Sequence, residues 1–223
     1  MDRSSSSVED DLRSVFAHLI TSLNGDERTI EKWTASLIAR YSEPQRKYHT
    51  TSHINSMLRC LSTSSSHSNN PTALKLFILF HDIVYDPQRH DNELQSIVVF
   101  ETFADELSIP QDMHKTVDRY IKATISHTID PSDEPDEDLK LCLDFDLEVL
   151  SREEAEYRLY SSQIREEYRH FGEQEYAEGR VAVLEKFLGR ERLFFTDEFY
   201  EKFEERARRN LQFEIKELRA KLI

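Results

Sequence analysis

Residues 74–82 read LKLFILFHD, the most apolar stretch of this 223-residue chain. Lys75 is its only charged residue before the terminal pair, His81 and Asp82. A segment that is apolar almost all round is typical of a buried helix, so we expect a central helix here. It is far too short to span a bilayer.

Helical spacing continues on both sides of this stretch. Apolar side chains recur at intervals of three and four residues. They predict helices over 8–23, 26–41, from about Thr50 to Leu61, 91–107, 111–128, 138–150, from a capping box at Ser151 to Phe171, between Gly172 and Gly189, and from Thr196 to the C-terminus. With only 4 Gly and 6 Pro, the chain has too few turn residues for a sandwich or barrel. We therefore predict an all-α fold, one domain of about ten helices over 8–223, after a disordered tip at 1–7.

The charge balance is strongly acidic, with 29 Lys and Arg against 43 Asp and Glu and a net charge of −14. This balance argues against binding to nucleic-acid polymers or anionic membranes. The segment 129–137 is expected to be an acidic loop.

Only two cysteines, Cys60 and Cys142, are present, and the N-terminus has no apolar run. Both features favour an intracellular location, the cytoplasm first, with the nucleus left open.

Three segments carry the residue types of a metal site: YHTTSH (48–53), FHD (80–82) and LDFDL (143–147). Each alone has an ordinary explanation, as a helix cap or a hydrogen-bonded core histidine. Taken together, two imidazoles and two carboxylates suit a divalent ion such as Mn, Fe, Co or Mg. Such an ion lowers the pKa of a bound water and polarises a phosphoryl oxygen. The pattern therefore predicts phosphoester hydrolysis.

At this point the sequence resembles the HD superfamily of metal-dependent phosphohydrolases, and more closely an uncharacterised family of predicted metal-dependent HD phosphohydrolases within it. The likeness covers about 41–218 and rests on RKYHTTSHI (46–54), FHDIVYDP (80–87), DNELQS (91–96), IKATISH (121–127), DFDLEVL (144–150), IREEY (164–168), GRVAVLEKFL (179–188) and ARRNLQFEI (207–215). It implies an HD-type helical domain with one metal. The implied ligands are His53, His81, Asp82 and Asp146, with Asp146 preferred to Asp144.

The resemblance also suggests roles for residues around the metal. His49 would protonate the leaving oxygen, or alternatively orient a ligand by a hydrogen bond. Glu93 would orient the attacking water or position a ligand histidine, or simply begin a helix. Asp82 completes the catalytic set. Four further residues are candidates for contact with the substrate phosphate: Lys122, His127, Arg165 and Arg180, with an ion pair between helices as the alternative for each arginine.

The sequence thus predicts an enzyme that hydrolyses a small phosphorylated substrate, of which a nucleotide is one candidate. Whether it is a monoesterase or a diesterase is left open, as are the metal and the oligomeric state. Two alternatives remain: a nucleotide-sensing module that binds without turnover, and a helical interaction scaffold.

Overall fold

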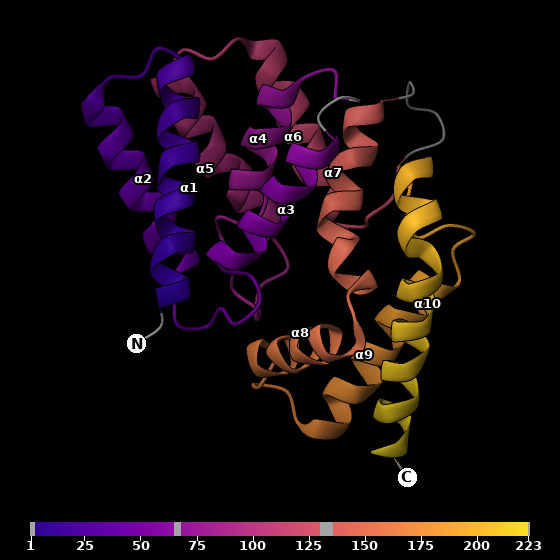
Figure 1. The fold of residues 1–223 in the computed structure, drawn as a ribbon. Helices are drawn as coiled ribbons and strands as arrows, with labels where there is room; N and C mark the ends of the chain where they lie inside the picture. Colours follow the sequence, from indigo (N-terminus) through magenta and orange to yellow (C-terminus); the bar gives the residue numbers. More distant parts are fainter. Residues whose placement is uncertain (1–2, 65–67, 130–135, 223) are drawn as a thin grey trace. The chain divides into compact units, whose positions relative to one another are not determined.

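The computed structural model describes residues 3–64, 68–129 and 136–222, with side chains described from residue 9 onward. Over these residues the chain forms ten α-helices and no strand, which confirms the all-α prediction (Figure 1). The elements are α1 (Arg3–Ser22), α2 (Glu27–Tyr41), α3 (Thr51–Ser64), α4 (Pro71–Phe80), α5 (Asn92–Glu106), α6 (Gln111–Thr124), α7 (Glu137–Leu147), the 3-10 helix η2 (Glu148–Ser151), α8 (Glu154–Glu167), α9 (Glu173–Leu188) and α10 (Asp197–Ala220).

The chain divides into two compact units, residues 1–142 and 143–223. The boundary falls inside α7, a continuous helix, so no linker rich in Gly or Pro marks it in the sequence. The expectation of a single domain over 8–223 stays a prediction.

Helix α4 is the centre of the first unit. The Asn70 side chain caps its first turn by accepting from the amide of Ala73, and Pro71 occupies a position where its missing N–H is not needed. Every residue from Leu76 to Phe80 is buried, and α4 packs against α3, α5 and α6. The buried central helix predicted from LKLFILFHD is therefore confirmed, and its last turn delivers His81 and Asp82.

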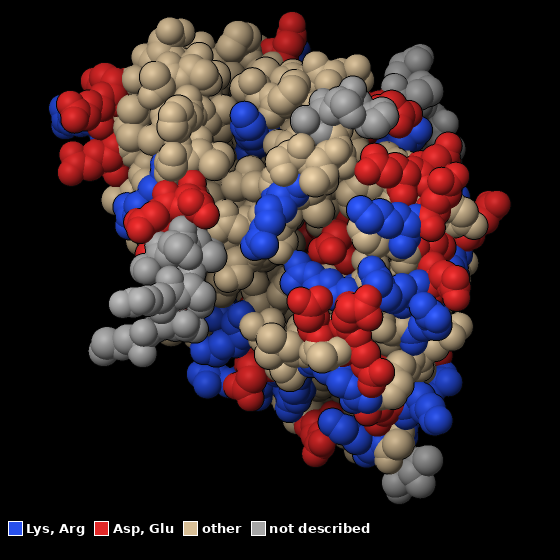
Figure 2. Space-filling view, in the orientation of Figure 1, with Lys and Arg blue, Asp and Glu red and all other residues tan. Residues whose placement is uncertain are grey.

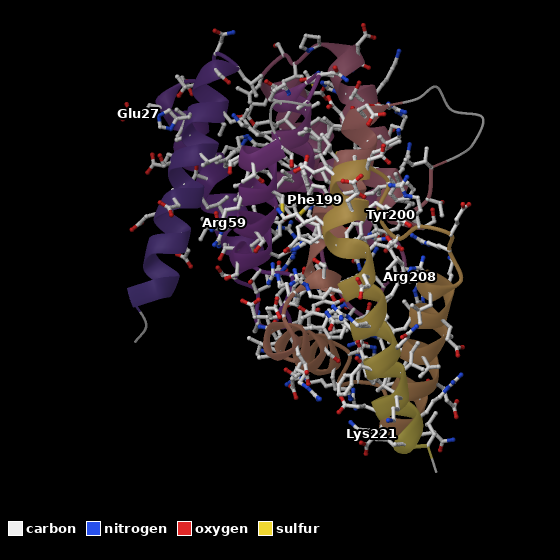
Figure 3. All side chains as sticks on the ribbon, turned by 45° about the vertical axis from the view of Figure 1, so that its right-hand side comes forward. Glu27, Arg59, Phe199, Tyr200, Arg208 and Lys221 are labelled. Atoms are coloured by element: carbon white, nitrogen blue, oxygen red, sulfur yellow. The ribbon has the colours of Figure 1, made fainter. Side chains whose placement is uncertain are left out.

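The second unit is organised around α10, the longest helix of the chain, on which Phe199, Arg208 and Lys221 mark successive positions (Figure 3). Helix α10 packs against α8, α9 and η2. The predicted start of this helix at Thr196 is its N-cap in the structure, and the Thr196 side chain accepts from the amide of Phe199. Lys and Arg alternate with Asp and Glu over α8–α10 on the face that Figure 2 shows. This agrees with the near balance of 15 basic and 17 acidic residues in 151–223.

The structure corrects the capping box predicted at Ser151. Ser151 ends η2, is fully buried, and its hydroxyl donates back to the carbonyl of Glu148. Helix α8 instead begins after Glu153, whose side chain makes no capping hydrogen bond. The pattern Ser-x-x-Glu therefore does not mark a capping box here, because the Ser151 hydroxyl already makes a hydrogen bond within the preceding turn.

Two further expectations concern the chain's less regular segments. Helix α1 begins at Arg3, so residues 3–7, predicted as part of a disordered tip, are helical. Most of the predicted acidic loop, 130–135, lies outside the described residues.

None of the helices in the described part of the chain combines the length and the apolar character needed to cross a bilayer.

Candidate metal centre

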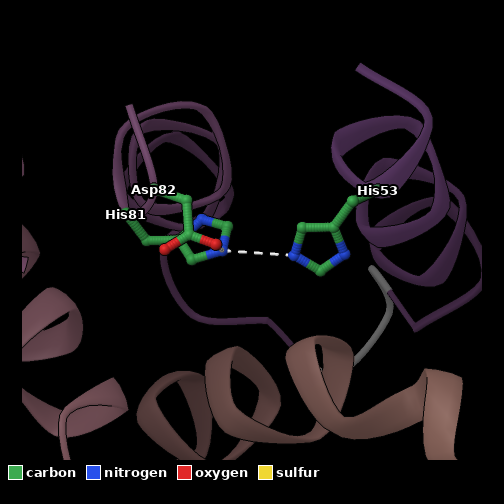
Figure 4. Close-up of side chains that lie close together, drawn as sticks. All are labelled: His53, His81 and Asp82. Atoms are coloured by element: carbon green, nitrogen blue, oxygen red, sulfur yellow. Dashed lines mark hydrogen bonds and ion pairs between the residues drawn. The ribbon is translucent and has the colours of Figure 1, made fainter. Parts of the chain in front are cut away.

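His53, His81 and Asp82 converge in the first unit. His53 lies in the first turn of α3, and His81 and Asp82 directly follow α4 (Figure 4). One ligand atom from each lies within 4.8 Å of the others. Both histidines are buried, whereas the Asp82 side chain is 16% exposed. Three metal-ligand residues predicted from the sequence are therefore brought together.

The hydrogen bonds of His81 fix the direction of its ring. Its Nδ1 lies 3.1 Å from the carbonyl oxygen of Ile78, which can only accept, so Nδ1 carries the proton. Its Nε2 then faces His53 Nε2 at 3.3 Å and Asp82 Oδ2 at 3.2 Å. In the neutral ring this Nε2 presents a lone pair to a carboxylate oxygen. The lone pair and the carboxylate oxygen repel each other. A proton or a metal ion between His81 Nε2 and Asp82 Oδ2 must offset this repulsion.

The spacing of these atoms fits a metal ion. Two ligand atoms about 2.1 Å from an ion, at angles between a right angle and a tetrahedral angle, lie roughly 3.0–3.4 Å apart. Both distances from His81 Nε2 fall in that range. The Tyr48 hydroxyl lies 3.0 Å from His53 Nδ1, which leaves His53 Nε2 directed at the cluster. Partners on the far ring nitrogens are the usual way in which proteins orient metal-binding histidines.

His49 lies beside this cluster but not on α3. The helix begins at Thr51, so His49 precedes the helix whose first turn carries His53. The ring of His49 instead stacks on Tyr85, with centroids 4.3 Å apart. Its Nε2 is 3.9 Å from Asp82 Oδ2, and its side chain is 20% exposed. The residue proposed to move a proton therefore lies close to the cluster and is accessible.

The backbone that carries His49 and Asp82 is held by Arg46, which sequence reasoning did not single out. The Arg46 side chain has no exposed surface. Its Nη1 donates to the carbonyls of His49 at 3.0 Å and Asp82 at 2.8 Å, and its Nη2 donates to that of Ile83 at 3.1 Å. Its guanidinium also lies over the rings of Tyr41 and Tyr85. One buried side chain thus joins the two segments of the site.

Helix α5 holds the same loop from the other side. Asn92 accepts from the amide of Asp86 and donates to its carbonyl, while Ser96 accepts from the amide of Val84. Both belong to the DNELQS stretch that the resemblance highlights. In the structure, these two side chains position the loop that follows Asp82.

Glu93 and His127 belong electrostatically to the same cluster. Burial raises the pKa of Glu93, and the charge of Asp82 raises it further, while His127 and His81 lower it. His127 has a left-handed backbone, with φ of 48°, just after α6. A non-glycine residue in this region costs of the order of 1 kcal/mol, and such strain gathers at functional sites. The charges of Asp82, His81 and His127 therefore all act on Glu93, which lies within electrostatic reach of the cluster.

The pH dependence of stability tests the environment of Glu93. A carboxyl with a raised pKa stabilises the fold below its unfolded pKa, and this contribution is lost as pH rises through the folded value. In chelator-treated protein, we expect Glu93→Gln to gain stability relative to the wild type as pH rises above about 4, the ordinary range of a glutamate in the unfolded chain. Urea unfolding at several pH values measures this difference. A difference that does not change with pH would contradict the raised pKa.

Of the two aspartates in LDFDL, Asp144 has a structural role. Asp144 is fully buried, and it accepts from the amides of Phe195 and Thr196 and from the Thr196 hydroxyl at 2.6–2.9 Å. Both of its oxygens are thus used to fix the start of α10. Asp146 lies on α7 in the second unit and is partly exposed. The preference for Asp146 over Asp144 is supported, and Asp146 as a metal ligand stays a prediction.

The other predicted phosphate contacts have structural partners. Lys122 pairs with Asp118 at 2.7 Å on the surface of α6. In the second unit, Arg165 donates to the carbonyls of Tyr168 and Phe171. Arg180 pairs with the buried Glu214 of α10 at 2.9 Å, which is the alternative that the sequence left open. The geometry gives none of the three a role in phosphate binding.

Comparison with known proteins adds no family to this geometry. Searches of protein-family models, curated proteins and solved structures give no match to the chain. The resemblance to the HD superfamily therefore stays a prediction, and the cluster itself carries the functional argument.

Proposed function

We propose that this protein is a metal-dependent phosphohydrolase, with His53, His81 and Asp82 holding a divalent cation. The observation that carries the proposal is the convergence of His53 Nε2 and Asp82 Oδ2 on His81 Nε2, whose proton lies on the opposite nitrogen. When bound, such a cation supplies Lewis-acid chemistry, which polarises a phosphoryl oxygen and makes water nucleophilic at neutral pH.

The surrounding side chains supply the remaining parts of a hydrolytic site. His49, whose Nε2 lies 3.9 Å from Asp82 Oδ2, protonates the departing oxygen of the substrate. The raised pKa of Glu93 suits a group that accepts a proton from the attacking water. His127 donates to the phosphate and complements its charge. Arg46 keeps His49 and Asp82 in register.

Release of nitrophenol or of inorganic phosphate from phosphoesters tests this proposal. The full chain is treated with chelator, reloaded with Mn²⁺, Co²⁺ or Mg²⁺, and assayed on para-nitrophenyl phosphate, bis-para-nitrophenyl phosphate and a panel of nucleotides. We expect metal-dependent hydrolysis of at least one class. Binding of about one metal per chain without turnover on the panel would favour a sensing module. No metal binding at all would favour a scaffold and contradict the proposal.

Arg46→Lys tests how far the metal site depends on the buried guanidinium. Lysine keeps the charge but cannot donate to three carbonyls in the same geometry. We expect a loss of about 2 kcal/mol in the free energy of unfolding and about a tenfold loss in Mn²⁺ affinity. Urea unfolding and calorimetric titration measure the two effects.

The chain offers a matched control in Arg208 of the second unit. Arg208 likewise donates to three backbone carbonyls, those of Leu188, Arg190 and Glu191, and pairs with Glu204. Arg208→Lys should lower stability while leaving Mn²⁺ affinity unchanged. Equal effects of both variants on affinity would show that Arg46 acts only through general stability.

A further inference from the structure

The second unit contains a cavity between α8 and α9 that the metal site does not use. Its volume is about 380 Å³, within the range of small-molecule binding sites. The aromatic side chains of Tyr168, Phe171 and Tyr176 line it, together with Val183 and Arg180. The lining is therefore mainly apolar and aromatic, with one cation, Arg180, and one carboxylate, Glu175.

A glycine keeps this cavity open. Gly179 lies near the middle of α9, one turn from Glu175 and one turn from Val183, which also line the cavity. Glycine inside a helix costs about 1 kcal/mol relative to alanine. A Cβ built at Gly179 would meet no atom within 4 Å, so packing does not require the glycine. The absence of a side chain at Gly179 leaves the volume of the cavity beside it empty.

The aromatic walls are fixed in place without a ligand. Arg165 donates to the carbonyls of Tyr168 and Phe171 at 2.9 and 3.1 Å, and its guanidinium lies 4.6 Å from the centre of the Tyr176 ring. The rings of Tyr168 and Phe171 are nearly parallel, with an interplanar angle of 10°. Rigid walls of this kind lower the entropic cost of binding.

Arg180 provides the polar feature of the cavity. Its Nε and Nη2 donate to Glu214 and Tyr160, while its Nη1 donates to no residue that the structure describes. Because Glu214 already balances its charge, a ligand here needs an acceptor rather than a full negative charge. We propose that this cavity binds a flat aromatic molecule that carries a neutral hydrogen-bond acceptor, independently of the metal centre.

Methyl NMR on the full chain tests this site with a matched pair of probes. Benzamide has an aromatic ring and a carbonyl acceptor, and cyclohexanecarboxamide has the same acceptor on a saturated ring. Ile164 and Val183 line the cavity and report on it through their methyl groups. We expect benzamide to shift both signals saturably, with at least threefold tighter binding than the saturated amide. Equal binding of the two amides, or no shift, would overturn the proposal.

Two glycine variants connect the shifts to the cavity. Gly179→Leu should fill the volume and abolish benzamide binding while the protein stays folded, because a Cβ at this position meets no atom within 4 Å and the rest of the side chain enters the cavity. Gly172→Ala, at the N-cap of α9 and outside the lining, should bind benzamide like the wild type. Undiminished binding by Gly179→Leu would overturn the site. So would methyl shifts that follow protein concentration instead of benzamide, which would assign the groove to a second copy of the chain.

Discussion

Asp82→Asn is expected to weaken Mn²⁺ binding by about 100-fold, or roughly 2.7 kcal/mol, and to reduce phosphohydrolase activity to about the same extent. Asparagine keeps the size of the side chain but removes the negative charge that lies 3.2 Å from His81 Nε2. The two imidazoles alone then hold the cation. Because Asp82 is partly exposed, the metal-free variant should unfold within about 1 kcal/mol of the wild type. Calorimetric titration and phosphate release measure the two losses.

Asp86→Asn is the control for this experiment. Asp86 lies in the same loop and makes the same change of charge on substitution, but its carboxylate serves only the local turn by accepting from the amide of Gln88. Its variant should bind Mn²⁺ like the wild type. Equal losses in both variants would mean that the general charge of the loop, rather than a ligand at Asp82, attracts the cation.

Asp144→Ala should produce the largest loss of stability, about 3 kcal/mol or more. The substitution leaves the amides of Phe195 and Thr196 and the Thr196 hydroxyl without the carboxylate to which they donate. All of these groups lie at the start of α10, around which the second unit packs. Urea unfolding followed by circular dichroism measures the loss.

Asp146→Ala, two residues along the same helix, should show the opposite pattern. Residues two apart on a helix point to nearly opposite sides. Asp144 therefore faces the interior, and Asp146 does not. Asp146→Ala should cost less than about 1 kcal/mol of stability. A loss of stability equal to that of Asp144→Ala would contradict the structural role assigned to Asp144 alone.

The helices could be predicted because their signals are local. Apolar spacing is a signal within single helices, and the structure confirms a buried helix over LKLFILF (74–80) and a last helix that begins directly after Thr196. The capping box at Ser151 failed because an equally local hydrogen bond, to the carbonyl of Glu148, competes for the same hydroxyl. A local pattern predicts a helix cap reliably only where no group of the neighbouring turn hydrogen-bonds to the same side chain.

The centre of the site was predictable for a different reason. His53, His81 and Asp82 are the residue types that metals need, and their order along the chain carries the resemblance. Arg46 could not be found in this way, because most arginines are exposed and nothing near it in sequence marks it as buried. Its role depends on three carbonyls, two of them in a segment more than thirty residues away. The choice between Asp144 and Asp146 likewise depended on the distant start of α10.

X-ray absorption at the cobalt edge, on the full chain reloaded with one equivalent of Co²⁺, tests the metal centre most directly. The account predicts a bound ion whose scattering shows about two imidazole rings together with oxygen ligands. His81→Ala should lose one of the two rings. A coordination shell made only of oxygen, or cobalt that washes out of the wild-type protein, would contradict the account.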